Sequence, residues 1–114
     1  MNEKNESVIF ENQNVKLEVN VKDETVWLTT EQMSELFERD RTVISRHIKN
    51  IFFENELSQY STFAKNAQIE NWKTYYTDYY NLDVIISVGY RVTSKNGILF
   101  RTWANNVLKD YFIK

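Results

Sequence analysis

The sequence contains no cysteine and no proline, and it has only two glycines and one histidine. The absence of cysteine excludes disulfide frameworks, thiolate zinc sites and cysteine nucleophiles. Without proline- or glycine-rich stretches, nothing marks a linker between domains. No apolar run approaches the roughly 20 residues that a membrane-spanning helix needs. The polar, acidic first residues do not resemble a signal peptide, so we expect a soluble cytoplasmic protein with no membrane partner.

The 114 residues, of which 42% are hydrophobic and 26% charged, are typical of one globular domain, here residues 1–114. The net charge is −2, but the charges are unevenly distributed. Residues 1–38 hold nine acidic residues and three lysines, whereas residues 39–49 hold four bases and one acid. A weakly acidic protein therefore carries a compact basic segment, which is either a solvated face or a binding surface.

The first 37 residues predict strands followed by a short helix. Apolar and polar residues alternate over residues 15–22, which is typical of a strand with one buried face. Residues 8–10 and 25–28 are also β-prone, so we expect an amino-terminal β hairpin or meander. Thr29 and Gln32 have capping-box spacing. The helix that they begin would bury Met33, Leu36 and Phe37.

A second helix is predicted at about residues 41–52, with Asp40 as its N-cap. Ile44, Ile48 and Ile51 repeat at helical spacing and predict one buried face. The opposite arc carries basic and hydroxyl-bearing side chains, namely Arg41, Thr42, Ser45, Arg46 and Lys49. The two helices and their short connection indicate a helix-turn-helix, although the turn has Glu38 where many such motifs have glycine.

The second half of the chain predicts a β pair and carboxy-terminal helices. Residues 61–64 and 72–77 look like strands around a polar bend at residues 68–71. The apolar run at 82–88 is either a strand or a buried helix, for which Asp83 is a candidate N-cap. Ser94 would cap a last helix with one apolar face, formed by Leu99, Phe100, Trp103, Ala104, Val107, Leu108 and Tyr111. The expected fold is α+β, a winged helix-turn-helix-like domain.

Double-stranded DNA is the partner that this pattern predicts. A helix-turn-helix lays its second helix in the major groove, where arginine can bind guanine and hydroxyls can bind phosphates or bases. The β pair would form a wing beside the helix. The expected DNA-binding residues are Arg39, Arg41, Thr42, Ser45, Arg46 and Lys49, with Lys73 on the wing. The alternative is that the two helices only complete the core.

The sequence offers little for catalysis. With His47 as the single histidine, no serine–histidine–aspartate arrangement can be assembled with support from the sequence. Histidines and carboxylates do not cluster at metal-ligand spacing, and Glu54 and Glu56 are better explained as loop residues. We therefore expect no enzyme, no cofactor, no metal and no small-molecule substrate.

The chain resembles the amino-terminal region of the virulence RhuM family. The resemblance is carried by residues 24–29, 41–52, 80–92 and 100–104, with Val107 and Leu108. It implies a bacterial protein encoded on mobile or pathogenicity-associated DNA, of which these residues would be the front portion. The end of the chain is similar, more distantly, to the Bro-N and KilA-N domains of phage and viral proteins, which are associated with DNA binding. By that analogy we expect a transcriptional or mobile-element regulator.

Two other functions are consistent with the sequence. The chain could be a protein-interaction or dimerisation module, with Trp103, Tyr111 and Phe112 as an apolar patch. It could also be the targeting domain of a longer toxin or virulence protein.

Overall fold

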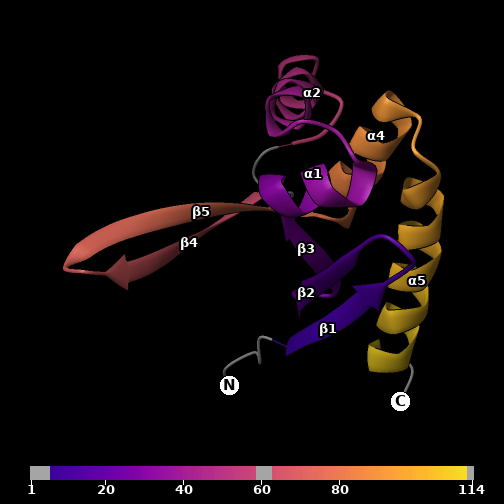
Figure 1. Ribbon diagram of the computed structural model, residues 1–114, viewed down its shortest axis with the longest axis horizontal. Coiled ribbons are helices and arrows are strands. Elements are labelled where there is room, and N and C mark those ends of the chain that lie inside the picture. The colour runs from indigo at the N-terminus through magenta and orange to yellow at the C-terminus, as the bar shows by residue number, and fades with distance from the viewer. Residues whose placement is uncertain (1–5, 59–62, 113–114) are drawn as a thin grey trace.

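The computed structural model describes residues 6–58 and 63–112, and for residues 63–70, 111 and 112 it describes the backbone alone. The fold is α+β, with a five-stranded antiparallel sheet in the order β1-β2-β3-β5-β4. The described elements are β1 (Glu6–Glu11), β2 (Lys16–Lys22), β3 (Thr25–Thr29), α1 (Thr30–Phe37), α2 (Arg41–Phe53), β4 (Phe63–Glu70), β5 (Lys73–Asn81), α4 (Leu82–Val92) and α5 (Lys95–Phe112). Helices α1, α2 and α4 gather beyond one end of the first three strands, and α5 runs alongside β1 (Figure 1).

The first three strands form the predicted amino-terminal meander. Strand β2 pairs with β1 on one side and β3 on the other, with Val19 opposite Val8 and Val21 opposite Val26. The predicted alternation of buried and exposed residues is present in β2: Leu17, Val19 and Val21 are buried, while the residues between them lie toward solvent. This prediction is confirmed because a period of two places alternate side chains on one face of a strand.

Helix α1 begins at the predicted capping box. The Thr29 hydroxyl accepts a hydrogen bond from the Gln32 N–H at 3.1 Å, and the Gln32 side chain accepts one from the Thr29 N–H at 3.0 Å. The Gln32 amide also donates to the Glu18 carbonyl of β2 at 2.7 Å. These bonds satisfy free donors at the helix start, and they tie that start to the sheet.

The turn between α1 and α2 is built without glycine. Glu38 ends α1 in the left-handed conformation, at φ 55° and ψ 48°. The Arg39 N–H donates to the Ser34 carbonyl at 3.2 Å, and the Ser34 hydroxyl donates to the Arg39 carbonyl at 2.5 Å. A residue in this conformation commonly ends a helix, but its Cβ makes it costly for any residue other than glycine.

The apolar run at 82–88, which the sequence left open between strand and helix, is the start of α4. Asp83 is not its N-cap; Asn81 is, and the Asn81 side chain accepts from the Val84 N–H at 3.3 Å. Asn81 holds this position because it is the last residue of β5 and has extended backbone angles. Asp83 lies instead in the first turn, where a negative charge is favourable to the helix dipole.

Helix α5 follows the predicted Ser94 cap, whose hydroxyl accepts from the Asn96 N–H at 3.2 Å. Phe100 and Ala104 are buried, and the Trp103 ring lies 5.3 Å from that of Phe10 on β1. Leu99, expected on the buried face, is 54% exposed. Leu99 lies about 100° around the helix from Phe100, at the margin of the stripe.

Trp103 is therefore a packing residue rather than part of a free apolar patch. The side chains of Tyr111 and Phe112, the other two members of the expected patch, lie outside the described residues.

Helices α4 and α5 approach closely at their two glycines. A Cβ added to Gly89 would lie 3.3 Å from the Phe37 ring of α1 and 3.5 Å from the Cα of Gly97. Three helices thus meet at a point where a Cβ on Gly89 would require the Phe37 ring to shift by a few tenths of an ångström.

Strands β4 and β5 form a long hairpin that projects from the body of the molecule (Figure 1). The bend predicted at residues 68–71 is misplaced: Gln68 and Glu70 pair within the hairpin, and the turn consists of Asn71 and Trp72. Residues 61 and 62, expected to begin the first strand, lie outside the described residues. At its base, β5 joins the meander through β3, where Thr29 faces Tyr79.

We predict that Glu38→Gly stabilises the fold by about 0.5–1 kcal/mol, because glycine relieves the left-handed strain at a modest entropic cost. Glu38→Ala is the matched control, since it removes the same charge but keeps a Cβ at positive φ. Urea unfolding of both variants measures the difference. Equal stabilities for the two variants would contradict a strained turn.

Candidate functional site

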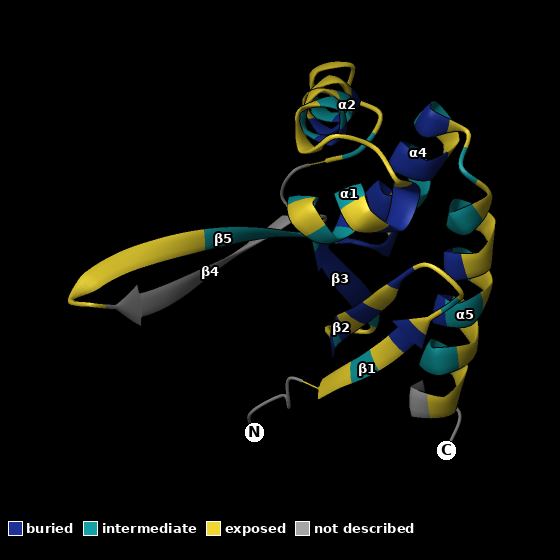
Figure 2. Cartoon of the chain, in the orientation of Figure 1, coloured by how far each residue is buried: buried dark blue, intermediate teal, exposed yellow. Residues whose placement is uncertain are grey.

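The orientation of α2 is set by its isoleucines. Ile44, Ile48 and Ile51 are buried, and the helix packs against α1 and α4. Because these three residues share one face, the opposite face is turned away from the core. Figure 2 shows this exposed face along the outer coils of α2.

The exposed face of α2 contains most of the residues predicted to bind DNA. Arg41, Thr42, Arg46 and Lys49 are exposed, and Ser45 is half-buried. They share one helix, so the structure brings these five side chains to a single surface. We call this surface, Arg41, Thr42, Ser45, Arg46 and Lys49, the basic face.

Asp40 occupies the N-cap position of α2, as predicted, but its side chain makes no capping hydrogen bond. Its carbonyl oxygen accepts the first helical bond, from the Ile44 N–H at 3.1 Å. The predicted N-cap is therefore confirmed, and the capping contact that it makes comes from its backbone carbonyl.

Arg39 lies outside the basic face. Its guanidinium donates through Nη1 to the carbonyls of Phe37 and Glu38, at 3.1 and 3.2 Å, and through Nη2 to the carbonyl of Val92 at 2.9 Å. Phe37 and Val92 are the last residues of α1 and α4. A cation at these carbonyls is favourable to both helix dipoles. Arg39 therefore joins two helix ends, and we leave it out of the candidate site.

Among the described residues, the basic face forms one ion pair. Arg41 Nη1 lies 3.5 Å from Glu31 Oε1, and both side chains are mostly exposed. Exposed pairs of this kind contribute little because water and salt screen them. Within the described part of the chain, Arg46 and Lys49 form no ion pair. The positive charge of this surface is therefore largely uncompensated at short range.

His47 is half-buried beside the basic face. Burial lowers the pKa of His47 below its usual value, and the nearby Arg91 and Arg46 guanidinium groups lower this pKa further. The imidazole is therefore mainly neutral at pH 7 and adds little charge to the surface.

A polar groove separates the start of α2 from the hairpin. It has a volume of about 430 Å³ and is lined by Arg41 and Ser45 of α2, by residues at the start of α1, and by Tyr76, Thr77 and Asp78 of β5. Tyr76 and Thr77 belong to the predicted wing strand, but their place beside α2 could not be predicted from the sequence, because the groove forms only when β5 pairs with β3. The groove places the base of the hairpin beside the basic face.

Lys73, the predicted wing contact, is exposed at the start of β5, next to the hairpin turn. Tyr76 lies three positions further along the strand, which corresponds to about 10 Å. The structure therefore keeps Lys73 on the same hairpin as the groove but does not bring it to the basic face.

The end of α2 is anchored by residues far apart in the sequence. Arg91 Nη2 lies 2.9 Å from Glu56 Oε1 and 3.2 Å from Glu54 Oε2. Hydrogen bonds from Ser87 and Arg91 hold the pKa of Glu56 below its usual value. Glu54 and Glu56 are loop residues, as expected, but the sequence held no signal for Arg91, which is 35 positions away from Glu56.

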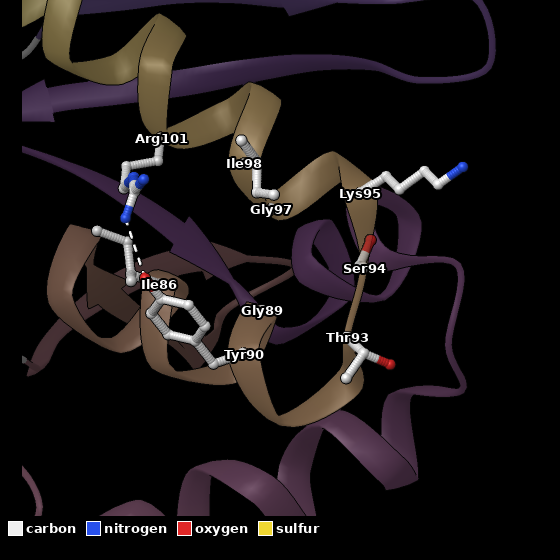
Figure 3. Close-up of a pocket in the computed structure, with 9 residues that line it drawn as sticks. All are labelled: Ile86, Gly89, Tyr90, Thr93, Ser94, Lys95, Gly97, Ile98 and Arg101. Atoms are coloured by element: carbon white, nitrogen blue, oxygen red, sulfur yellow. Dashed lines mark hydrogen bonds between the residues drawn. The ribbon is translucent and has the colours of Figure 1, made fainter.

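A second, apolar groove lies between α4 and α5, with a volume of about 260 Å³. Figure 3 shows Ile86 and Ile98 at its walls and the two glycines at the contact between the helices. Arg101 donates to the Tyr90 hydroxyl at 3.0 Å across this groove (Figure 3). Ile98 is 62% exposed, so the groove opens onto an apolar surface.

The described residues contain no group of three or more histidine, aspartate or glutamate side chains arranged to bind a metal ion. None of the helices in that part of the chain combines the length and the hydropathy that crossing a bilayer requires.

Comparison with known proteins identifies one family. The model described as the virulence protein RhuM family matches residues 55–114, slightly more than half of the chain. This segment includes the hairpin, α4 and α5, whereas α1 and α2 precede it. No curated protein and no solved structure gives a significant match.

We predict that Arg39→Ala destabilises the fold by about 1 kcal/mol, because three backbone carbonyls lose a charged donor that is partly exposed to water. Arg46→Ala is the control, because Arg46 is an exposed arginine of α2. We expect it to change the free energy of unfolding by less than about 0.5 kcal/mol. Urea unfolding distinguishes the two. If both substitutions have the same small effect, Arg39 does not hold the helix ends together.

Proposed function

The chain belongs to the virulence protein RhuM family, and we propose that this member is a DNA-binding domain that places α2 in the major groove of a duplex. The family match defines no reaction, so the proposal rests on the residues of this chain. We infer that α1, the Glu38 turn and α2 act as a helix-turn-helix, with β4 and β5 as its wing. We also infer a distant similarity of the chain's end to Bro-N and KilA-N domains, which would support the proposal by analogy only.

The basic face carries this proposal. Three isoleucines hold one side of α2 in the core, and Arg41, Arg46 and Lys49 are all exposed on the other. A helix with its side chains is about 10–12 Å across, close to the roughly 12 Å width of the major groove. The surface therefore has the dimensions and the local charge that a duplex requires.

The alternative, a helix pair that only completes the core, explains the isoleucines but not the other side of α2. A solvated face usually mixes charges of both signs. Here the exposed arc of the helix carries three cations, and the carboxylate that forms an ion pair with one of them, Glu31, belongs to α1.

We assign the residues of the basic face by their chemistry. Arg41 and Arg46, toward the start of α2, would bind base edges, because a guanidinium can donate two hydrogen bonds to guanine. Thr42 and Ser45 would bind phosphates or bases through their hydroxyls. Lys49, one turn further along, would bind the phosphate backbone as a point charge.

The groove between α2 and β5 supports the assignment of the hairpin as a wing. It is lined by Arg41 and Ser45 on one side and by Thr77 and Asp78 on the other, so the base of the hairpin adjoins the basic face. A hairpin in this position would reach DNA beside the helix, with Lys73 at a phosphate. Such a domain would direct a regulator of transcription or of a mobile element to DNA.

The net charge of −2 means that the whole molecule does not attract DNA at long range. Binding must then come from short-range contacts with phosphates and bases. If the domain neutralises about four phosphates, Lys49 and Lys73 binding two of them, the logarithm of the binding constant should fall with the logarithm of salt concentration with a slope near −3.6.

We predict that Lys49→Ala changes this slope to about −2.7, because about one phosphate contact is lost. Arg46→Ala should weaken binding by about 1–3 kcal/mol on a preferred site and less on other sequences. Fluorescence anisotropy with duplexes of mixed sequence, at several salt concentrations, measures both effects.

Lys109→Ala is the matched control, because Lys109 is exposed in the last turn of α5, away from α2 (Figure 1). It should leave both the affinity and the slope unchanged. The absence of duplex binding by the unsubstituted protein at low salt, or an equal loss in the Lys109 variant, would refute the proposal.

Self-association is the second candidate function, and the apolar groove between α4 and α5 favours it. Tyr90, Ile98 and Leu99 are exposed on these two helices, and exposed apolar residues grouped beside a groove are typical of protein contacts. Helix-turn-helix proteins commonly bind two half-sites as dimers, so a second copy is the partner that this surface would bind.

We predict that Ile98→Glu converts a dimer to a monomer in sedimentation at micromolar concentrations, because it places a charge at the centre of the apolar surface. Asn105→Glu, at an exposed position on the same helix, should leave the dimer intact. A protein that sediments as a monomer without substitution would exclude this second function.

A further inference from the structure

The turn of the β4–β5 hairpin has an unusual composition. Asn71 and Trp72 are its two central residues, with φ angles of 52° and 67°. Two-residue hairpin turns with both φ angles positive favour asparagine followed by glycine. Asn71 matches that preference, but a tryptophan occupies the position of the glycine.

No packing of the Trp72 side chain compensates for this strained conformation. Its side chain is 100% exposed, at the end of a hairpin that stands clear of the other elements (Figure 2). A bulky residue at positive φ is sterically strained, and an exposed indole gains nothing from the hydrophobic effect. The folded domain alone therefore gives no physical reason for a tryptophan here, and strain of this kind is concentrated at functional positions.

The residues that follow make β5 aromatic on both faces. Tyr75 and Tyr76 are both exposed, and consecutive residues of a strand point to opposite faces. Tyr76 also lines the polar groove, so exposed aromatic residues extend along the hairpin from its base to Trp72. From residue 71 to residue 77, β5 and its turn carry one cation, Lys73, and no acid. In the backbone register of the hairpin, Lys73 lies opposite Glu70 of β4.

The position of Trp72 relative to α2 agrees with the dimensions of a duplex. The hairpin adjoins the start of α2 at Thr77, in the polar groove. Thr77 lies five positions along the strand from Trp72, which corresponds to about 17 Å. Half a turn of B-DNA, which separates a major groove from the neighbouring minor groove, is also about 17 Å. When α2 lies in the major groove, the hairpin is long enough to bring Trp72 to the adjacent minor groove.

We propose that Trp72 is a wedge that enters the minor groove and stacks against bases, opening one base step and bending the duplex. This inference rests on the proposed function. The minor groove is about 6 Å wide, enough for an aromatic ring but too narrow for a helix. Architectural DNA-binding proteins insert apolar side chains in this way and bend DNA toward the major groove.

The proposal makes stability and binding change in opposite directions. Trp72→Gly removes the strain at positive φ, so the hairpin should be as stable as before or more stable. The same substitution removes the stacking, and it should weaken duplex binding by about 5- to 150-fold. Trp72→Asn, which also tolerates this conformation, should behave in the same way, and Trp72→Phe should retain part of the affinity.

Tryptophan fluorescence provides a direct measurement, because the other two tryptophans are packed. Trp27 is buried and donates to the Lys22 carbonyl at 2.9 Å, and Trp103 packs against Phe10. Adding a mixed-sequence duplex of about 25 base pairs, longer than two helical turns, should quench the emission of Trp72. The same duplex should cause no quenching in Trp72→Phe. End-to-end energy transfer in a doubly labelled duplex should show bending by the unsubstituted protein and not by Trp72→Gly.

The outcomes separate this inference from the proposed function. If the unsubstituted protein binds the duplex and Trp72→Gly binds it equally tightly, or if binding leaves the emission of Trp72 unquenched, the wedge is refuted and the role of α2 stands. If neither protein binds the duplex, the proposed function fails and the wedge fails with it. If Trp72→Gly retains its DNA affinity but loses self-association, Trp72 contacts a second copy of the chain, and the wedge is again refuted.

Discussion

The burial of three isoleucines along one side of α2 is the contact on which the rest of the candidate site depends. Ile44, Ile48 and Ile51 occupy the space between α1 and α4, and burying side chains of this size contributes roughly 1.5–3 kcal/mol each. A rotation of α2 about its axis would expose them and bury arginine instead, which is costly without a partner for the charge. The hydrophobic contact therefore decides which residues face solvent, and the basic face is its consequence.

The supports around α2 restrict the same helix at both ends. At its start, Arg39 binds the carbonyls at the ends of α1 and α4, and the side-chain amide of Asn96 on α5 donates to the Leu36 carbonyl at 2.7 Å. At its end, Arg91 holds the following loop through Glu54 and Glu56. Polar side chains thus hold helix ends where the chain lacks glycine and proline to shape its turns. The close approach of Gly89 and Gly97 brings α4 and α5 into contact.

The two grooves differ in a way that matters for function. The polar groove joins α2 to the hairpin, and its lining combines a guanidinium, hydroxyls and two carboxylates. The apolar groove lies between α4 and α5, within the segment that the family model matches. A surface for DNA and a surface for a second copy would then occupy different elements, so one chain could use both at once.

Much of the fold could be predicted because its signals are local. The alternation in β2, the capping box at Thr29 and the isoleucine spacing in α2 each depend on residues within one or two turns of one another. Predictions that needed knowledge of neighbouring elements were less successful. The prediction of Asp83 as the N-cap of α4 was wrong because the position of this cap depends on where β5 ends. The predicted position of the hairpin turn was wrong because it depends on the register between β4 and β5.

The sequence by itself determined the amino-terminal strands, the start of both predicted helices in the first half, and the division of α2 into an apolar and a basic side. Tertiary structure alone decided that Arg39 binds a carbonyl 53 residues away, that Arg91 holds the end of α2, and that Trp72 stands fully exposed at a hairpin turn. The physical reason is distance along the chain. Periodicity and capping are set by nearby residues, whereas the partner of a long polar side chain, or the lack of packing around an aromatic one, depends on which distant elements the folded core brings together.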